Sequence, residues 1–162
     1  MKQKTAYMGM FLALALILSY VEALIPFQFG IPGVKLGLAN LVTVMMLYCT
    51  GAKEAFLLSV LRIVLAGFLF GNPFGIIYGL SGGILSFLVM YLLWRGDRLH
   101  VVSVSVAGGL SHNLGQLLAA SAVVENRNLF YYLPVLLAAG FVTGFLIGLL
   151  AQEMIVRVKR LK

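Results

Sequence analysis

The sequence has very little charge for its length. Only 10% of its 162 residues are charged, and 62% are hydrophobic, whereas a soluble domain has about 25% charged residues. A soluble domain of this length could not cover so much apolar surface. Lipid solvates the outside of a helical membrane domain, so the composition predicts an integral membrane protein.

Cysteine and acidic residues are also scarce. Cys49 is alone, which excludes an internal disulfide and a multi-cysteine metal site. The carboxylates lie one to a segment, too scattered for a local magnesium clamp: Glu22, Glu54, Asp97, Glu125 and Glu153. The sequence also lacks a glycine-rich phosphate loop after a strand and a nucleophile–base pair. We therefore expect no metal site, no cofactor and no catalytic activity of the chain by itself.

Long apolar runs predict an all-α protein, a compact bundle of six transmembrane helices in a single domain, residues 1–162. The expected spans cover residues 5–25, 36–50, 55–70, 74–94, 101–124 and 129–155. The second and third are short against the about 20 residues that a bilayer core requires. Each is therefore broken, partly re-entrant or extended into its flanking loops.

Most of the positive charge falls on one side of this predicted bundle. With six spans, the two termini share a side that carries nine of the twelve cations: Lys2, Lys4, Lys53, Arg95, Arg98, Arg157, Lys159, Arg160 and Lys162. Lys35 and Arg127 lie on the other side. Cytoplasmic segments are enriched in Lys and Arg, so we expect both termini in the cytoplasm. Cations at helix ends also argue against a nucleic-acid partner.

Polar side chains nevertheless occur inside the predicted spans. Arg62 lies near the middle of the third span, and His112, Asn113 and Gln116 lie near the middle of the fifth. His112 and Gln116 share a helix face, whereas Asn113 points about 100° away toward another neighbour. Polar groups at bilayer depth are costly and usually face a bundle interior.

These residues allow a binding site or interhelical hydrogen bonding, and the sequence leaves both open. Asn40 lies one turn into the second span, and Glu22 and Lys35 lie at the outer rim, where a lid or an ion pair can form. No acidic residue is expected at the depth of Arg62. An arginine without a carboxylate at midplane favours an anionic group of a ligand.

Glycines recur every four residues in two ladders, Gly71, Gly75, Gly79 and Gly83, and Gly140, Gly144 and Gly148. This spacing puts small residues on one helix face and lets a neighbouring backbone approach closely. We expect packing within the bundle, with a docking surface for a partner subunit as the alternative.

Six motifs together carry a family resemblance: GVKLGLANLV (33–42), KEA (53–55), LR (61–62), SGG (81–83), VSVAGG (104–109) and SHNLGQ (111–116). The chain closely resembles, over nearly its whole length, the bacterial membrane family called Gx transporter. This family is also labelled heptaprenyl diphosphate synthase component I. Its members resemble the substrate-binding S components of energy-coupling-factor (ECF) transporters, which are six-helix bundles.

The resemblance implies a location in the bacterial cytoplasmic membrane and an outward-opening cavity covered by the connection Pro26–Lys35. It also implies that small residues of the first helix dock a membrane coupling subunit, which works with an ATPase module. The pairs with the required spacing are Gly9 with Ala13 and Ala15 with Ser19.

Two functions follow from these observations. The first is an S-component-like transport protein that captures a small ligand, anionic or prenylated, from outside and moves it inward with a partner. Its predicted substrate-binding residues are Arg62, His112, Asn113, Gln116 and Asn40 in the cavity and Lys35 on the lid. The second is a non-catalytic membrane accessory subunit of prenyl diphosphate, quinone or electron-transfer machinery, beside a separate catalytic subunit.

Overall fold

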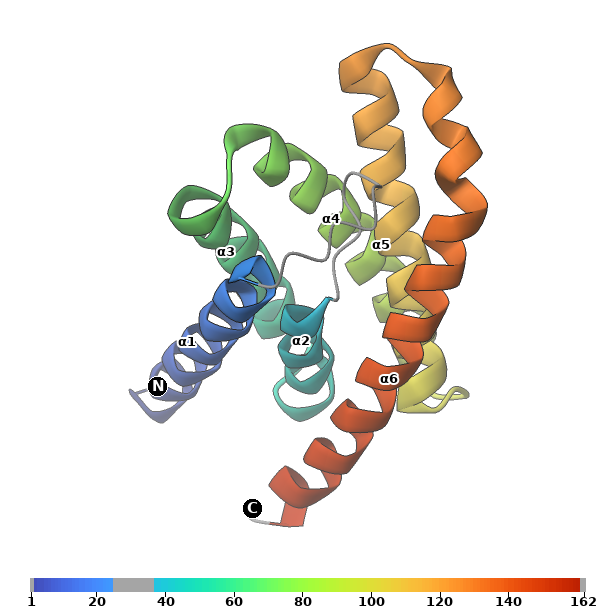
Figure 1. Ribbon diagram of the computed structural model, residues 1–162. Helices are drawn as coiled ribbons and strands as arrows, with labels where there is room; N and C mark the ends of the chain where they lie inside the picture. Colours follow the sequence, from blue (N-terminus) through green and yellow to red (C-terminus); the bar gives the residue numbers. More distant parts are fainter. Residues whose placement is uncertain (1, 25–36, 161–162) are drawn as a thin grey trace.

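The computed structural model describes residues 2–24 and 37–160, with the side chains of residues 5–24 and 37–158. These residues form six α-helices and one short 3₁₀ helix and contain no strand (Figure 1). The elements are α1 (Lys2–Leu24), α2 (Leu38–Cys49), α3 (Ala52–Phe70), α4 (Pro73–Arg95), α5 (Val101–Val124), η1 (Arg127–Tyr132) and α6 (Leu133–Arg160). The all-α prediction is confirmed.

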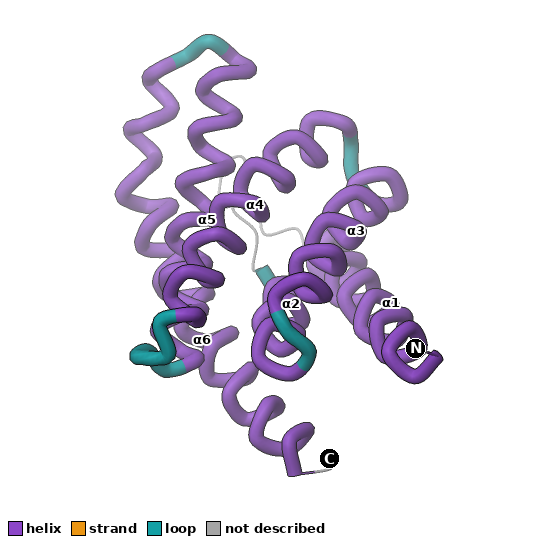
Figure 2. The backbone as a smooth tube through the Cα atoms, turned by 180° about the vertical axis from the view of Figure 1, so that it is seen from behind, coloured by secondary structure: helices purple, strands orange, loops and turns teal. Residues whose placement is uncertain are grey.

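Five helices form a closed ring in which α2, α3, α4, α5 and α6 each contact the next and α6 returns to α2. Helix α1 packs outside this ring, against α2 and α3. Figures 1 and 2 show this arrangement from opposite sides, with α1 at the margin and the α5–α6 hairpin extending beyond the other helices. The ring therefore places polar groups of α2, α3 and α5 toward a shared interior.

Helix α2 supplies the centre of the core. It has 12 residues, none of them exposed, and the stretch from Val42 to Leu47 is buried throughout. At a rise of about 1.5 Å per residue it is about 18 Å long, well short of a bilayer core. It begins after Gly37, whose φ of 73° suits glycine, and its last turn is closed by the Thr50 hydroxyl, which donates to the Met46 carbonyl at 2.8 Å.

Local sequence signals explain where α4 and α6 begin. At α4, the side chain of Asn72 accepts a hydrogen bond from the Gly75 N–H at 2.7 Å, and Pro73 occupies the first turn. Pro134 lies in the first turn of α6, where its missing N–H costs nothing. The predicted sixth span at 129–155 is therefore two elements, η1 and α6, and α6 continues beyond the predicted end to Arg160. Helix α3 extends back into the loop before it, and α5 matches its predicted bounds.

The outer surface of the bundle is apolar. Exposed large hydrophobic side chains occur on α1, α3, α4, α5, η1 and α6, as expected where lipid rather than water is the neighbour. By length and composition, three helical stretches among the described residues can cross a membrane: Thr5–Leu24, Pro73–Arg95 and Arg127–Val158. These features are those of a membrane protein.

Glycines allow close helix crossings inside the bundle. A Cβ added at Gly144 or Gly148 would lie 2.8 Å from the Cα of Val106 or Val102 on α5. A Cβ added at Gly83 would lie 2.5 Å from the side chain of Ile63 on α3. The packing interpretation is therefore confirmed for these positions of both ladders, which face neighbouring helices.

Candidate functional site

A hydrogen bond between Arg62 and Asn40 joins the middle of α3 to the first turn of α2. The Nη2 of Arg62 donates to Oδ1 of Asn40 at 3.0 Å in a partly buried setting. The Nε of Arg62 is buried and has no hydrogen-bond partner within the described part of the chain. Because a guanidinium has five N–H donors, this side chain retains donor capacity toward the interior.

Glu22, in the last turn of α1, adds a carboxylate to this pair. Its charge interacts with that of Arg62, and its Oε1 accepts a hydrogen bond from the backbone N–H of Gly37. The expectation that Arg62 lies without an acidic residue at its depth is therefore wrong. Helix α1 continues to Leu24 and packs against α2 and α3, which brings Glu22 to the cluster rather than to a solvated rim.

These four residues form what we call the Arg62 cluster: Glu22, Gly37, Asn40 and Arg62. It ties the end of α1 and the start of α2 to the middle of α3. The residues between α1 and α2, with Lys35 and the predicted lid, lie outside the described part of the chain. The lid therefore stays a prediction, but both described segments that flank it meet at the Arg62 cluster.

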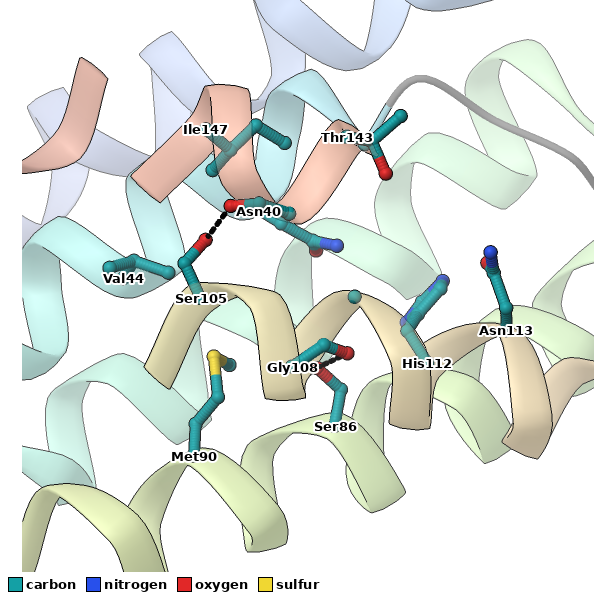
Figure 3. A pocket seen from close by; sticks show the side chains of 13 residues that line it. Asn40, Val44, Ser86, Met90, Ser105, Gly108, His112, Asn113, Thr143 and Ile147 are labelled. Atoms are coloured by element: carbon teal, nitrogen blue, oxygen red, sulfur yellow. Dashed lines mark hydrogen bonds between the residues drawn. The ribbon is translucent and has the colours of Figure 1, made fainter. Parts of the chain in front are cut away.

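A small cavity lies beside the cluster, between α2, α4, α5 and α6 (Figure 3). Its volume is about 30 Å³, room for one or two water molecules. Figure 3 shows Asn40 reaching it from α2, and His112 and Asn113 from α5. Its lining is completed by Gly37, Val44, Ser86, Met90, Ser105, Gly108, Gly109, Thr143, Gly144 and Ile147.

The structure thus brings together three of the predicted site residues, Asn40, His112 and Asn113, around one cavity. Arg62 is linked to them through its bond with Asn40. The Nδ2 of Asn113 donates to the Leu136 carbonyl of α6 at 2.7 Å. Asn113 therefore contacts a neighbour of its own, as its position on the helix predicted.

Gln116 is buried on the α4 side of α5. A Cβ added at Gly82 of α4 would lie 2.8 Å from the Cγ of Gln116 and 3.1 Å from the imidazole of His112. The two side chains therefore share a face, as predicted, and that face packs against Gly82. Gln116 stands apart from the residues that line the cavity.

Hydroxyl groups outside the predicted site also line the cavity. Ser86 donates to the Gly108 carbonyl and Ser105 to the Gly144 carbonyl, both at 2.8 Å, and Thr143 donates to the Ala139 carbonyl at 2.9 Å. Each hydroxyl has used its proton on a backbone carbonyl and offers a lone pair to any further group. Small polar residues beside glycines at helix crossings are the signal that indicates them.

The polar groups of this interior are hydrogen-bond donors and acceptors. Among the described residues, no three or more His, Cys, Asp or Glu side chains are grouped so that they could hold a metal ion. The Arg62 cluster and the cavity beside it together present a guanidinium, amides and hydroxyls, with one carboxylate from Glu22, and the donors among these groups can hold oxygen-rich groups of a ligand.

Comparison with protein families identifies one match. The family described as heptaprenyl diphosphate synthase component I matches residues 11–154. Because this match covers most of the sequence, the chain belongs to that family, as its motifs predicted. The description names one component of a synthase and so implies a partner subunit. Comparison with curated proteins and with solved structures gives no match.

Proposed function

We propose that this member of the heptaprenyl diphosphate synthase component I family is a non-catalytic ligand-binding subunit of a membrane assembly. It captures a small anionic ligand from outside the bacterial cytoplasmic membrane and moves it inward with a partner, as an ECF S component does. In this proposal six spans put both termini on one side of the membrane, and the excess of Lys and Arg on that side favours the cytoplasm. The observation that carries the proposal is the Arg62 cluster.

The guanidinium of Arg62 supplies the attraction for an anionic group. Its buried Nε has no acceptor within the described residues, and a buried donor left without an acceptor costs about 1–3 kcal/mol. An anionic oxygen of a ligand recovers that cost through a charge-assisted hydrogen bond. Asn40 fixes the guanidinium in place, so less side-chain freedom is lost when the ligand binds.

The position of the cluster links binding to closure of the predicted lid. Glu22 holds the start of α2 through Gly37 and also interacts with Arg62. A ligand anion at Arg62 competes with the Glu22 carboxylate for the guanidinium. Binding therefore changes the position of Glu22, whose carboxylate joins the end of α1 to Gly37 at the start of α2. Lys35 on the lid adds a second cation for the same anionic group.

Helix α1 offers a face for the partner. It lies outside the ring, Gly9 and Ala13 are exposed, and a Cβ added at Gly9 would meet nothing within 4 Å. Ala15 is buried and Ser19 half-buried, so this second pair packs inward. Of the two predicted pairs, Gly9 with Ala13 is the one open to a coupling subunit with its ATPase module.

A second function is favoured by the family description and by the small size of the cavity that His112 lines. A cavity of about 30 Å³ is far below the about 300–1,000 Å³ of small-molecule sites. In this second case the chain is a membrane accessory subunit beside a separate prenyl diphosphate synthase or electron-transfer subunit. Its polar residues then hold helices together.

Native mass spectrometry of protein purified from membranes in mild detergent separates the two functions. The wild type is expected to carry a small anionic adduct that Arg62→Ala loses, while Arg98→Ala, an exposed arginine in the α4–α5 loop, keeps it. Circular dichroism checks that each variant is folded. An adduct that survives in folded Arg62→Ala contradicts the proposal, and a retained synthase subunit without any adduct supports the accessory function.

A further inference from the structure

We propose that a groove at the tip of the α5–η1 hairpin binds one phosphatidylethanolamine molecule by its headgroup and the first carbons of an acyl chain. The groove has a volume of about 450 Å³ and is lined by Leu118, Ser121, Ala122, Glu125, Arg127 and Phe130. None of these residues lines the cavity beside the Arg62 cluster. The proposal therefore stands independently of the proposed function.

The turn that forms the groove is fixed by its own hydrogen bonds. The Ser121 hydroxyl donates to the Asn126 carbonyl at 3.2 Å, and the Asn126 N–H donates to the Ser121 carbonyl at 3.2 Å. The Asn126 side chain accepts from the Asn128 N–H at 2.9 Å, which starts η1. These bonds fix the shape of the turn. Glu125 and Arg127 flank Asn126 in the sequence, and both line the groove.

The charges match a zwitterionic headgroup. Glu125 and Arg127 are exposed, and neither forms an ion pair with another described residue. A primary ammonium can donate to the Glu125 carboxylate while the neighbouring phosphate accepts from the Arg127 guanidinium. Phosphatidylglycerol has no ammonium for Glu125, and phosphatidylcholine has no N–H to donate. The pair therefore favours phosphatidylethanolamine over these two lipids.

The rest of the groove and its surroundings are suited to a lipid rather than to a water-soluble zwitterion. Leu118 and Ala122 of α5 and Phe130 of η1 give the groove an apolar wall. Tyr131 and Tyr132 of η1 are 84% and 41% exposed. Exposed aromatic side chains of this kind gather where a membrane meets water, at the level of the headgroups. In Figure 1 the turn between α5 and η1 lies at the upper end of the bundle.

The test is lipid titration of the full chain in detergent, followed by native mass spectrometry, with phosphatidylethanolamine, phosphatidylcholine and phosphatidylglycerol of the same acyl chains. We expect one phosphatidylethanolamine to bind preferentially. Loss of one exposed charge pair corresponds to about fivefold weaker binding, so Glu125→Gln and Arg127→Gln should each reduce binding by about that factor. Glu153→Gln and Arg98→Gln, which remove exposed charges elsewhere, should leave it unchanged.

Each remaining outcome overturns the proposal. Equal binding of the three lipids, or tighter binding of phosphatidylglycerol, means that Glu125 does not select the headgroup. Unchanged phosphatidylethanolamine binding in both groove variants means that the lipid lies elsewhere. Competition by glycerophosphoethanolamine as strong as that of the intact lipid means that the apolar wall contributes nothing.

Discussion

Asn40 accepts a hydrogen bond from Arg62 across the α2–α3 contact, and the guanidinium depends on that acceptor inside the bundle. Asn40→Ala removes the acceptor of one N–H of the Arg62 guanidinium. We expect the free energy of unfolding to fall by about 1–3 kcal/mol, the usual cost of an unsatisfied buried donor. Denaturation in mixed detergent and SDS micelles, followed by circular dichroism, measures this change.

Asn128→Ala is the matched control for this residue, because Asn128 is exposed in η1. Surface substitutions of this kind usually change stability by less than about 0.5 kcal/mol. Equal stability of Asn40→Ala and Asn128→Ala would show that the bond to Arg62 contributes nothing to the fold.

Individual contacts of this cluster could be predicted only in part from the sequence. Arg62 was identifiable because a charge inside an apolar run needs an interior partner. Glu22 as its electrostatic partner was not, because the face of α1 that meets α2 and α3 is set by packing between helices far apart in sequence. Asn113 lay between these cases, since its angular offset from His112 indicated a separate neighbour but not the Leu136 carbonyl that it contacts.

Among whole elements, the helices with clear boundary signals were predicted best. Helix α5 matches its predicted residues 101–124, and α4 starts at the Asn72–Pro73 capping signal. Helix α2 is shorter than predicted because Gly37 adopts a left-handed conformation just before it. Apolar residues on both sides of Gly37 gave no periodicity that could place this start. The position of α1 outside the ring is likewise a result of tertiary packing.

The contact between α5 and α6 gives a second prediction. A Cβ added at Gly144 would lie 2.8 Å from the Cα of Val106 and 2.9 Å from the Ser105 carbonyl oxygen. Both are backbone atoms, so the helices must separate. Gly144→Ala is therefore expected to lower the free energy of unfolding by about 1–3 kcal/mol, the usual cost of overpacking, in the same SDS titration.

Gly9→Ala makes the same chemical change where a Cβ would meet nothing within 4 Å. Alanine favours a helix over glycine by up to about 1 kcal/mol, so this variant should be as stable as the wild type or more stable. If Gly144→Ala is as stable as Gly9→Ala, close backbone packing is not what holds α5 against α6.

On the scale of the whole molecule, the connections fall at two ends of the bundle. The start of α1, the end of α6, the α2–α3 turn and the α4–α5 loop lie at the lower end of Figure 1, and the α3–α4 and α5–η1 turns lie at the upper end. Lys53 follows the α2–α3 turn, Arg95 and Arg98 end α4 and lie in the α4–α5 loop, and Arg127 follows the α5–η1 turn. This distribution supports the six-span arrangement with cytoplasmic termini.

Cysteine labelling of intact bacterial cells tests that arrangement. Cys49, which is half-buried, is first replaced by serine, and one exposed uncharged residue at each end then becomes cysteine: Leu99→Cys in the α4–α5 loop or Asn128→Cys in η1. Neither change alters the balance of positive charge that sets orientation. A membrane-impermeant maleimide should label Asn128→Cys in intact cells and Leu99→Cys only after permeabilisation.

The pattern of labelling shows whether α5 crosses the membrane and, if it does, in which direction. If both cysteines react in intact cells, the chain does not cross the membrane between α4 and η1, and α5 is not a span. If Leu99→Cys alone reacts, α5 crosses but the termini face outward. The described ends that flank the predicted lid, Leu24 of α1 and Gly37 before α2, would then lie toward the cytoplasmic side. For the proposed function, a reversed orientation would thus mean that the ligand is captured from the cytoplasm and not from outside the cell.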